Sequence, residues 1–140
     1  MKPALAVLLL ALAVAGCKRH GDAQVGDKLT GNWVATGSYR NGGNFKSTLT
    51  IGRSGNYVCH LVTQGESGPT RTNALEGTFQ IKDGILTDTV TKHSNTNAVL
   101  PMITRARIVR IDEGEMVLKW DLAEGVESAT NEVVFRRLGK

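Results

Sequence analysis

The octapeptide EMVLKWDL, residues Glu115 to Leu122, carries the pattern that decides the fold. Its apolar side chains fall on every second position: Met116, Leu118, Trp120 and Leu122. A β-strand places alternate side chains on opposite faces, so this spacing predicts a strand with one buried and one exposed face. Three further segments alternate in the same way: Phe45 to Ile51, Tyr57 to Leu61 and Leu75 to Ile81. No segment after residue 16 shows a convincing helical repeat, so we expect an all-β domain over residues 29–140.

Clusters of turn-forming residues interrupt this region at near-regular intervals. There are seven such clusters: Asn41 to Asn44, Arg53 to Asn56, Gly65 to Pro69, Lys82 to Gly84, His93 to Asn97, Asp112 to Gly114, and Ala123 to Ser128. Seven breaks separate eight strands. Eight strands joined in sequence favour an up-and-down antiparallel β-barrel, because closure removes the exposed edges of a flat sheet. A two-sheet sandwich is the alternative, and the interior of such a barrel either is filled by side chains or holds one small ligand.

One segment, Ile103 to Ile111 (ITRARIVRI), departs from simple alternation. Neither of its faces is uniformly apolar, because arginines fall on both. A β-bulge near Val109 would exchange the two faces partway along the strand and restore the pattern. We therefore expect an irregularity at that position.

Short motifs at both ends of the predicted barrel carry a family resemblance. Leu29-Thr30-Gly31-Asn32-Trp33 opens the first strand, and Phe135-Arg136-Arg137-Leu138 ends the last. With Gly77-Thr78-Phe79, Asp83-Gly84-Ile85-Leu86 and Met116-Val117-Leu118, they make Leu29 to Leu138 resemble the lipocalin and calycin pattern of bacterial lipocalin-like lipoproteins.

The resemblance implies that Trp33, in the Gly31-x-Trp33 motif, plugs one end of the barrel while an arginine of the last strand packs over its indole. A guanidinium on an indole face gains about 0.5 to 2 kcal/mol. Arg136 and Arg137 are both candidates, and Arg137 is favoured if Phe135 faces inward, because residues two apart on a strand share a face. The alternative is that Trp33 is simply a core aromatic residue.

The first residues have the layout of a secretory signal. Lys2 precedes the apolar run Ala4 to Ala15, which is shorter than the about 20 residues that a membrane-spanning helix needs. Val14-Ala15-Gly16-Cys17 resembles the bacterial lipobox, which implies removal of residues 1–16 and attachment of lipid to Cys17. The alternative is an A-x-A cleavage site at Ala13 to Ala15, which would leave Cys17 as a free thiol.

A lipid-bearing Cys17 would anchor the protein in a bacterial membrane, because two or three acyl chains bind a bilayer stably. Residues 17–28 are polar, so we expect a flexible tether between the lipid and the barrel domain. Lys18 follows the cysteine, and by analogy with enteric bacteria it favours the outer membrane, at its periplasmic face, over the inner membrane. The protein would then belong to the cell envelope.

Composition adds two constraints. The net charge of +4 falls to +3 when residues 1–16, whose one charged side chain is that of Lys2, are removed, and this is too little to indicate a nucleic-acid partner. If Cys17 carries lipid, Cys59 has no disulfide partner within the chain. We expect Cys59 to be a small buried apolar residue, with a reactive thiol as the alternative.

The sequence contains little that indicates catalysis. Cys59 and His60 are adjacent on a predicted strand and point to opposite faces, so they cannot form a dyad. No pair of histidines, cysteines or carboxylates has metal-ligand spacing, and no nucleophile motif is present. We interpret five acidic residues beside turns as solvated carboxylates: Asp83, Asp88, Asp112, Glu113 and Glu115. We therefore expect no enzyme activity, cofactor or metal.

Two features suggest binding. Trp33 and five further residues could line a small apolar pocket in the barrel: Tyr57, Phe79, Met116, Trp120 and Phe135. The alternative is that they fill the core. Four basic residues on the last strands could form a basic face toward phosphorylated or anionic lipid, or simply part of a mixed solvated face: Arg105, Arg107, Lys119 and Arg136. We expect a binding module for a small apolar or amphiphilic ligand, and the alternative is a structural or protein-interaction component, with its protein partner unknown, that acts through its outer surface.

Overall fold

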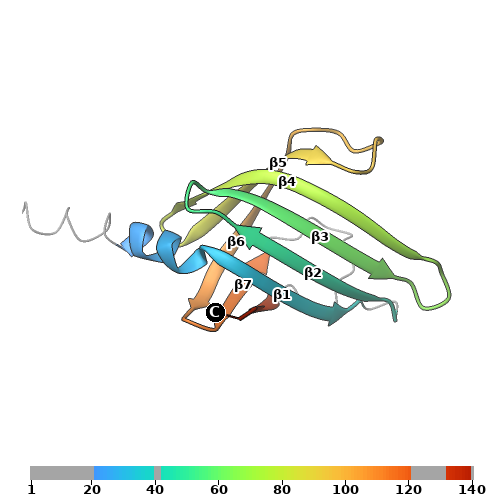
Figure 1. Cartoon of the computed structure of the whole chain (residues 1–140), viewed down its shortest axis with the longest axis horizontal. Coiled ribbons are helices and arrows are strands. Elements are labelled where there is room, and N and C mark those ends of the chain that lie inside the picture. Colours follow the sequence, from blue (N-terminus) through green and yellow to red (C-terminus); the bar gives the residue numbers. More distant parts are fainter. Residues whose placement is uncertain (1–20, 40–41, 121–131, 140) are drawn as a thin grey trace, which may run out of the picture.

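The computed structural model describes residues 21–39, 42–120 and 132–139 of the chain (Figure 1). Eight strands follow one another: β1 (Gly31–Ser38), β2 (Asn44–Ile51), β3 (Asn56–Gln64), β4 (Thr70–Lys82), β5 (Ile85–His93), β6 (Met102–Ile111), β7 (Glu115–Trp120) and β8 (Glu132–Arg137). Each strand pairs antiparallel with the next and β8 pairs with β1, so the sheet closes into a barrel. The expected all-β, eight-stranded up-and-down barrel is confirmed. The predicted break Ala123 to Ser128, the signal segment and Cys17 lie outside the described residues.

Alternation along the strands puts one set of side chains inside the barrel. On β7, Met116 and Leu118 are buried and Lys119 is exposed, although Val117 is buried as well. On β1, Trp33 and Ala35 are buried and their neighbour Asn32 is exposed. The core therefore lies along the barrel axis, and it is built from the period-two pattern that the sequence shows.

Among the described residues, strand pairing is irregular at two places. Between β6 and β7, Ile108 pairs with Leu118 and Arg110 with Val117, so Val109 is an extra residue and is half exposed. This confirms the bulge expected at Val109. Between β4 and β5 the register shifts at Glu76/Gly77. A β-bulge bends a strand and increases its twist, which helps a sheet curve into a closed barrel.

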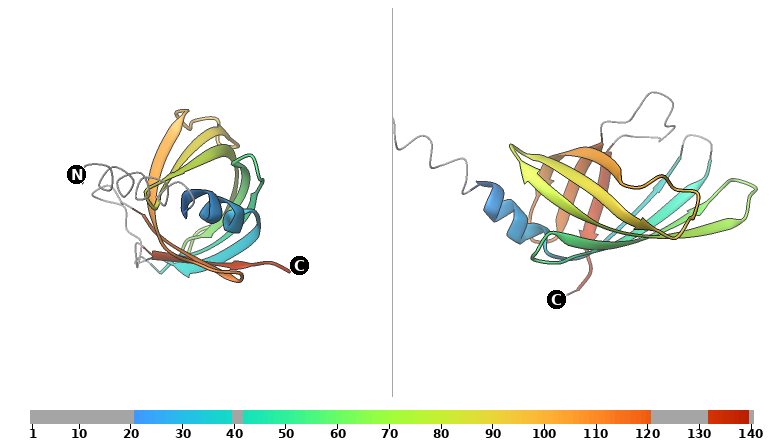
Figure 2. Two further views of the ribbon diagram at one scale, coloured as in Figure 1. Left: turned by 90° about the vertical axis from the view of Figure 1, so that its left-hand side faces the viewer. Right: turned by 90° about the horizontal axis from the view of Figure 1, so that it is seen from above.

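Residues 21–29, which precede β1, are helical, where we expected part of a flexible tether. Figure 2 shows this helix lying across one opening of the barrel. Val25 and Leu29 are four residues apart and share a helix face, which packs on the core; Leu29 is fully buried. Within the described parts of the chain, no helix is long and apolar enough to cross a membrane.

Two side chains, one from the first strand and one from the last, bind carbonyl groups at the end of this helix. The final C=O groups of a helix have no partner within it. The Trp33 indole N–H donates to the Leu29 carbonyl oxygen at 2.7 Å. The Arg137 guanidinium donates to the carbonyl oxygens of Lys28, at 2.5 Å, and Thr30, at 2.7 Å. The helix is thereby fixed on the barrel.

Arg137 also packs directly on Trp33. Its guanidinium carbon lies 4.1 Å from the centroid of the indole ring, which is the arrangement that the resemblance implied, and Arg136 is exposed on the opposite side of β8. The backbone conformation and the close approach of Arg137 explain why residue 31 of the motif is glycine. Gly31 has a φ of +137°, and a Cβ atom there would collide with the Arg137 guanidinium. Only glycine combines that backbone conformation with so close an approach.

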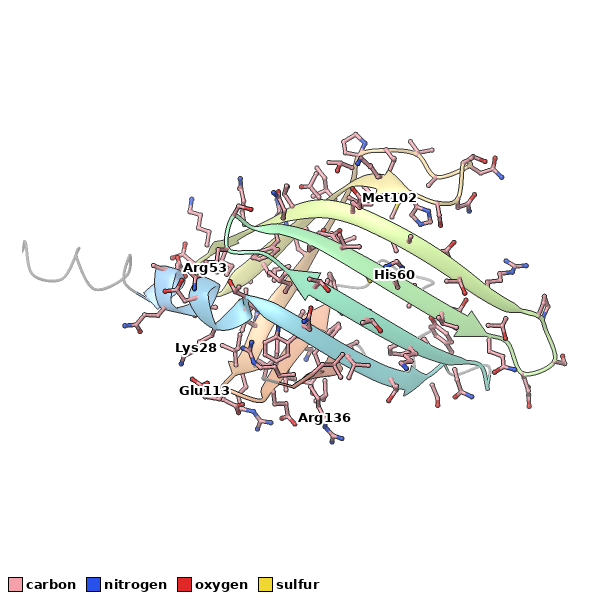
Figure 3. All side chains as sticks on the ribbon, in the orientation of Figure 1. Lys28, Arg53, His60, Met102, Glu113 and Arg136 are labelled. Atoms are coloured by element: carbon pink, nitrogen blue, oxygen red, sulfur yellow. The ribbon has the colours of Figure 1, made fainter. Side chains whose placement is uncertain are left out.

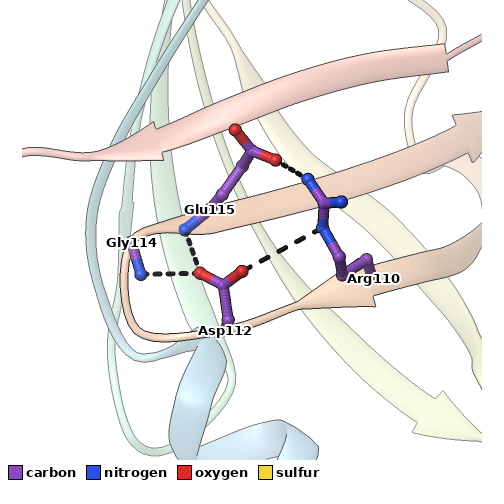
Figure 4. Close-up of polar contacts among 4 residues, drawn as sticks. All are labelled: Arg110, Asp112, Gly114 and Glu115. Atoms are coloured by element: carbon purple, nitrogen blue, oxygen red, sulfur yellow. Dashed lines mark hydrogen bonds and ion pairs between the residues drawn. The ribbon is translucent and has the colours of Figure 1, made fainter.

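The β6–β7 turn supplies a further anchor for Arg137. The Asp112 carboxylate accepts hydrogen bonds from the backbone N–H groups of Gly114 and Glu115, at 2.9 and 2.8 Å, and Arg110 pairs with Glu115 (Figure 4). These contacts hold the turn in one conformation. The Glu113 carbonyl oxygen then accepts a hydrogen bond from Arg137 Nε at 2.7 Å. One side chain thus joins β8, the helix, the start of β1 and the β6–β7 turn.

We expect Arg137→Ala to lower the free energy of unfolding by about 3 kcal/mol, because it removes charge-assisted hydrogen bonds and the cation–π contact together. Urea unfolding followed by circular dichroism measures this change. Arg136→Ala is the matched control and should change the free energy of unfolding by less than about 0.5 kcal/mol. Equal effects of the two substitutions would contradict this role of Arg137.

Candidate functional site

A cavity of about 130 Å³ lies inside the barrel, beyond the end that Trp33 and the helix close. Most of its lining is apolar and comes from β2, β3, β4, β5, β7 and β8. The five pocket residues expected from the sequence besides Trp33 all line it: Tyr57, Phe79, Met116, Trp120 and Phe135. Trp33 does not line the cavity, because its indole is used to plug the barrel end.

Five of the lining residues carry polar side-chain atoms: Ser47, Tyr57, Cys59, Asp88 and Trp120. Asp88 lies in the middle of β5 and faces inward between Leu86 and Val90, both of which are buried. Our interpretation of Asp88 as a solvated carboxylate beside a turn is therefore wrong. The sequence did contain the signal, since Leu86, Asp88 and Val90 are spaced two apart and must share a face.

Gly77 on β4 makes room for the Tyr57 hydroxyl. A Cβ atom at this position would lie 2.9 Å from Tyr57 Oη and would collide with the Thr89 carbonyl oxygen. The absence of a side chain at the β4–β5 bulge thus lets the Tyr57 hydroxyl and the β5 backbone approach β4 together. The bulge and the glycine are part of how the site is built.

Asp88 and Tyr57 are incompletely paired. The Thr104 hydroxyl donates to one Asp88 carboxylate oxygen at 3.4 Å. Among the described residues, the other carboxylate oxygen and the Tyr57 hydroxyl are buried without a hydrogen-bond partner. The two groups are close enough for each to shift the pKa of the other, yet no hydrogen bond of normal geometry joins them. A buried polar atom without a partner costs about 1 to 3 kcal/mol.

Burial dominates the protonation of these groups. It raises the pKa of the Asp88 carboxyl above its ordinary range, and the Tyr57 and Thr104 hydroxyls oppose this shift. Burial, followed by the neighbouring Asp88 carboxylate, strongly raises the pKa of Tyr57. Tyr57 therefore remains a neutral hydroxyl at physiological pH, and the cavity favours the protonated form of Asp88.

Cys59 lines the cavity as well, with its Sγ 3.4 Å from the Ser47 hydroxyl. It is a free cysteine and partly buried, and burial raises its pKa. A thiol with a raised pKa forms little thiolate and is a poor nucleophile. His60 is exposed on the outer surface of β3 (Figure 3), so the structure separates it from Cys59 as the strand pattern predicted.

The four basic residues on β6, β7 and β8 are all exposed: Arg105, Arg107, Lys119 and Arg136. Arg107 pairs across the strands with Lys119, but Lys119 also pairs with Glu132 and Arg136 with Glu115. Positive and negative side chains therefore alternate on this outer surface. That arrangement is typical of a mixed solvated face.

No group of three His, Cys, Asp or Glu residues among those described is arranged to hold a metal ion. No protein-family model matches the sequence, and no curated protein is significantly similar to it. The geometry of the cavity is therefore the basis for a functional proposal.

We expect Asp88→Asn to raise the free energy of unfolding at pH 7 by roughly 1 kcal/mol, because it replaces a buried carboxylate by a neutral group of the same shape. The folded-state pKa of Asp88 is raised, so between its ordinary and folded values the folded protein holds a proton that the unfolded chain has released. The free energy of unfolding should therefore fall as the pH rises through this interval, and stay flat above it.

Urea unfolding of both proteins between pH 4 and pH 8 measures the effect as a difference, which cancels the titration of other groups. The wild-type protein should lose stability relative to Asp88→Asn as the pH rises. Asp27→Asn is the matched control, because Asp27 is exposed on the helix. A pH-independent difference between wild type and Asp88→Asn would refute the assignment.

Proposed function

We propose that the protein is a lipid-anchored envelope protein whose barrel binds a small apolar or amphiphilic ligand. The cavity is the observation that carries this proposal: an apolar space with few polar groups, about 130 Å³ in volume. Small-molecule sites have this composition. For comparison, an engineered apolar cavity of about 150 Å³ in another protein binds benzene. The ligand, or the part of it inside the barrel, is thus about the size of one aromatic ring.

The closed barrel also agrees with the lipocalin-like resemblance, and the Arg137–Trp33 contact adds support to it. A ligand-binding lipocalin-like lipoprotein would carry its lipid on Cys17. Four peptide steps separate Cys17 from residue 21, the first described residue of the helix, and they span at most about 14 Å. The barrel end that the helix covers would then be the end nearer the membrane, and the opposite end would face away from it.

We expect toluene to raise the melting temperature of the full chain held in phosphatidylcholine nanodiscs. A ligand at ten times its Kd stabilises the folded state by about 1.4 kcal/mol, which is a shift of several degrees for a domain of this size. Ser47→Leu should abolish the shift by filling the cavity, while Thr48→Leu, whose side chain lies on the other face of β2, should preserve it. An unchanged melting temperature at saturating toluene would argue against a ligand-binding barrel.

The anchor has its own test. The intact mass of protein extracted from membranes should correspond to a chain that begins at Cys17 and carries a diacylglyceryl group, and Cys17→Ser should release the protein into the soluble fraction. A mature chain that begins at Gly16 without lipid would refute the anchor and leave the barrel proposal untouched.

A second candidate function, an interaction component that acts through the outer surface, is favoured by one feature. The connection from β5 to β6 and the start of β6 expose large apolar side chains: Val99 (83%), Leu100 (40%) and Ile103 (62%). Neighbouring exposed apolar residues often mark contact surfaces. This function would gain support if small apolar molecules leave the melting temperature unchanged.

A further inference from the structure

The cavity contains an acidic group without a basic partner. Asp88 is the one carboxylate among its lining residues, and none of the described lining residues is Lys, Arg or His. The Asp88 side chain has a single hydrogen bond, from Thr104, in the described part of the chain. Buried charges in proteins normally have a partner of opposite charge, because removing an unpaired charge from water is costly. The Asp88 carboxyl is therefore either protonated and neutral, or ionised and paired with a cation that comes from outside the protein.

Two unpaired acceptor atoms lie in the same part of the barrel. One Asp88 carboxylate oxygen and the Tyr57 hydroxyl oxygen have no hydrogen-bond partner among the described residues. Both residues line the cavity, and they lie close enough to shift each other's pKa. A group with several N–H donors could bond to both oxygens at once.

Aromatic rings line the same space. Tyr57, Phe79, Trp120 and Phe135 come from four different strands and all contribute to the cavity wall. The negative faces of aromatic rings attract cations, most strongly where water is excluded. The wall thus combines a carboxylate with four rings, which suits a positively charged group better than a neutral one and disfavours an anion.

We infer that the ligand is a small apolar amine, whose protonated nitrogen is held by the Asp88 carboxylate and the Tyr57 hydroxyl and whose apolar body fills the rest of the cavity. This inference rests on the proposed binding function and names its ligand class. The volume of about 130 Å³ limits the buried part of the amine to roughly the size of one ring or a short alkyl chain.

Four probes of one shape test the charge requirement by isothermal titration calorimetry at pH 7.5: benzylamine, benzyl alcohol, toluene and benzoate. The protein is the full chain in phosphatidylcholine nanodiscs, and heats from empty nanodiscs are subtracted. We expect benzylamine to bind at least about tenfold more tightly than toluene, benzyl alcohol to lie between them, and benzoate to bind most weakly.

Substitutions test whether the Asp88 carboxylate and the Tyr57 hydroxyl bind the amine. Asp88→Asn keeps the shape of the side chain and should weaken benzylamine binding by about 10- to 100-fold while leaving toluene binding within a few-fold. Tyr57→Phe removes only the hydroxyl and should weaken benzylamine binding several-fold. Asp27→Asn makes the same change of net charge at an exposed site outside the cavity, so it should leave both affinities unchanged.

The outcomes separate the inference from the function on which it rests. Toluene or benzyl alcohol binding as tightly as benzylamine, or benzylamine binding that Asp88→Asn leaves intact, would overturn the amine inference and leave the binding module standing. Absence of binding for all four probes would overturn both. Because Asp88→Asn should be at least as stable as the wild type, a lost affinity in this variant would not reflect unfolding, and its circular dichroism spectrum checks this point.

Discussion

The contact between Arg137 and Trp33 is the constraint on which the rest of the structure depends. Strands β1 and β8 pair at only two positions among the described residues, Trp33 with Arg137 and Val34 with Arg136. The Leu138 N–H adds a hydrogen bond to the Asn32 carbonyl oxygen at 2.8 Å. So short a seam gives few backbone hydrogen bonds to close a barrel. The Arg137 side chain compensates by crossing the seam and bonding to carbonyl groups on both sides of it.

The same side chain also stabilises the helical residues 21–29. Residues 21–29 contain two glycines and two aspartates, which are poor helix formers, and the last carbonyl groups of a helix need partners. Arg137 and Trp33 supply those partners, and the positive charge of Arg137 lies where the helix dipole is negative. Barrel closure and the cover over its end are therefore one structural unit, and each stabilises the other.

With one end closed by this unit, the interior is not completely filled. The side chains of β2, β3, β4, β5, β7 and β8 meet around a space that contains a carboxyl group and a hydroxyl group with unused hydrogen-bonding capacity. A protein selected only for stability gains by replacing such groups with apolar side chains. Their presence in an otherwise apolar interior supports the proposal that the cavity binds a ligand.

The sequence by itself determined the strands, their number and the irregularity at Val109, because alternation with a period of two is a local property that any strand with one buried face must show. It also indicated the two ends of the barrel through Trp33 and Arg137, and five residues that line the cavity. Only the tertiary structure decided where the helical residues 21–29 lie, because burial of Leu29 and hydrogen bonds from Arg137, more than a hundred positions away, hold them on the barrel. Likewise, the spacing of Asp88 shows which face it shares, but whether it meets a basic partner depends on side chains from distant strands. Alternation is set by neighbours along the chain, whereas caps, charge pairing and unfilled volume are set by neighbours in space.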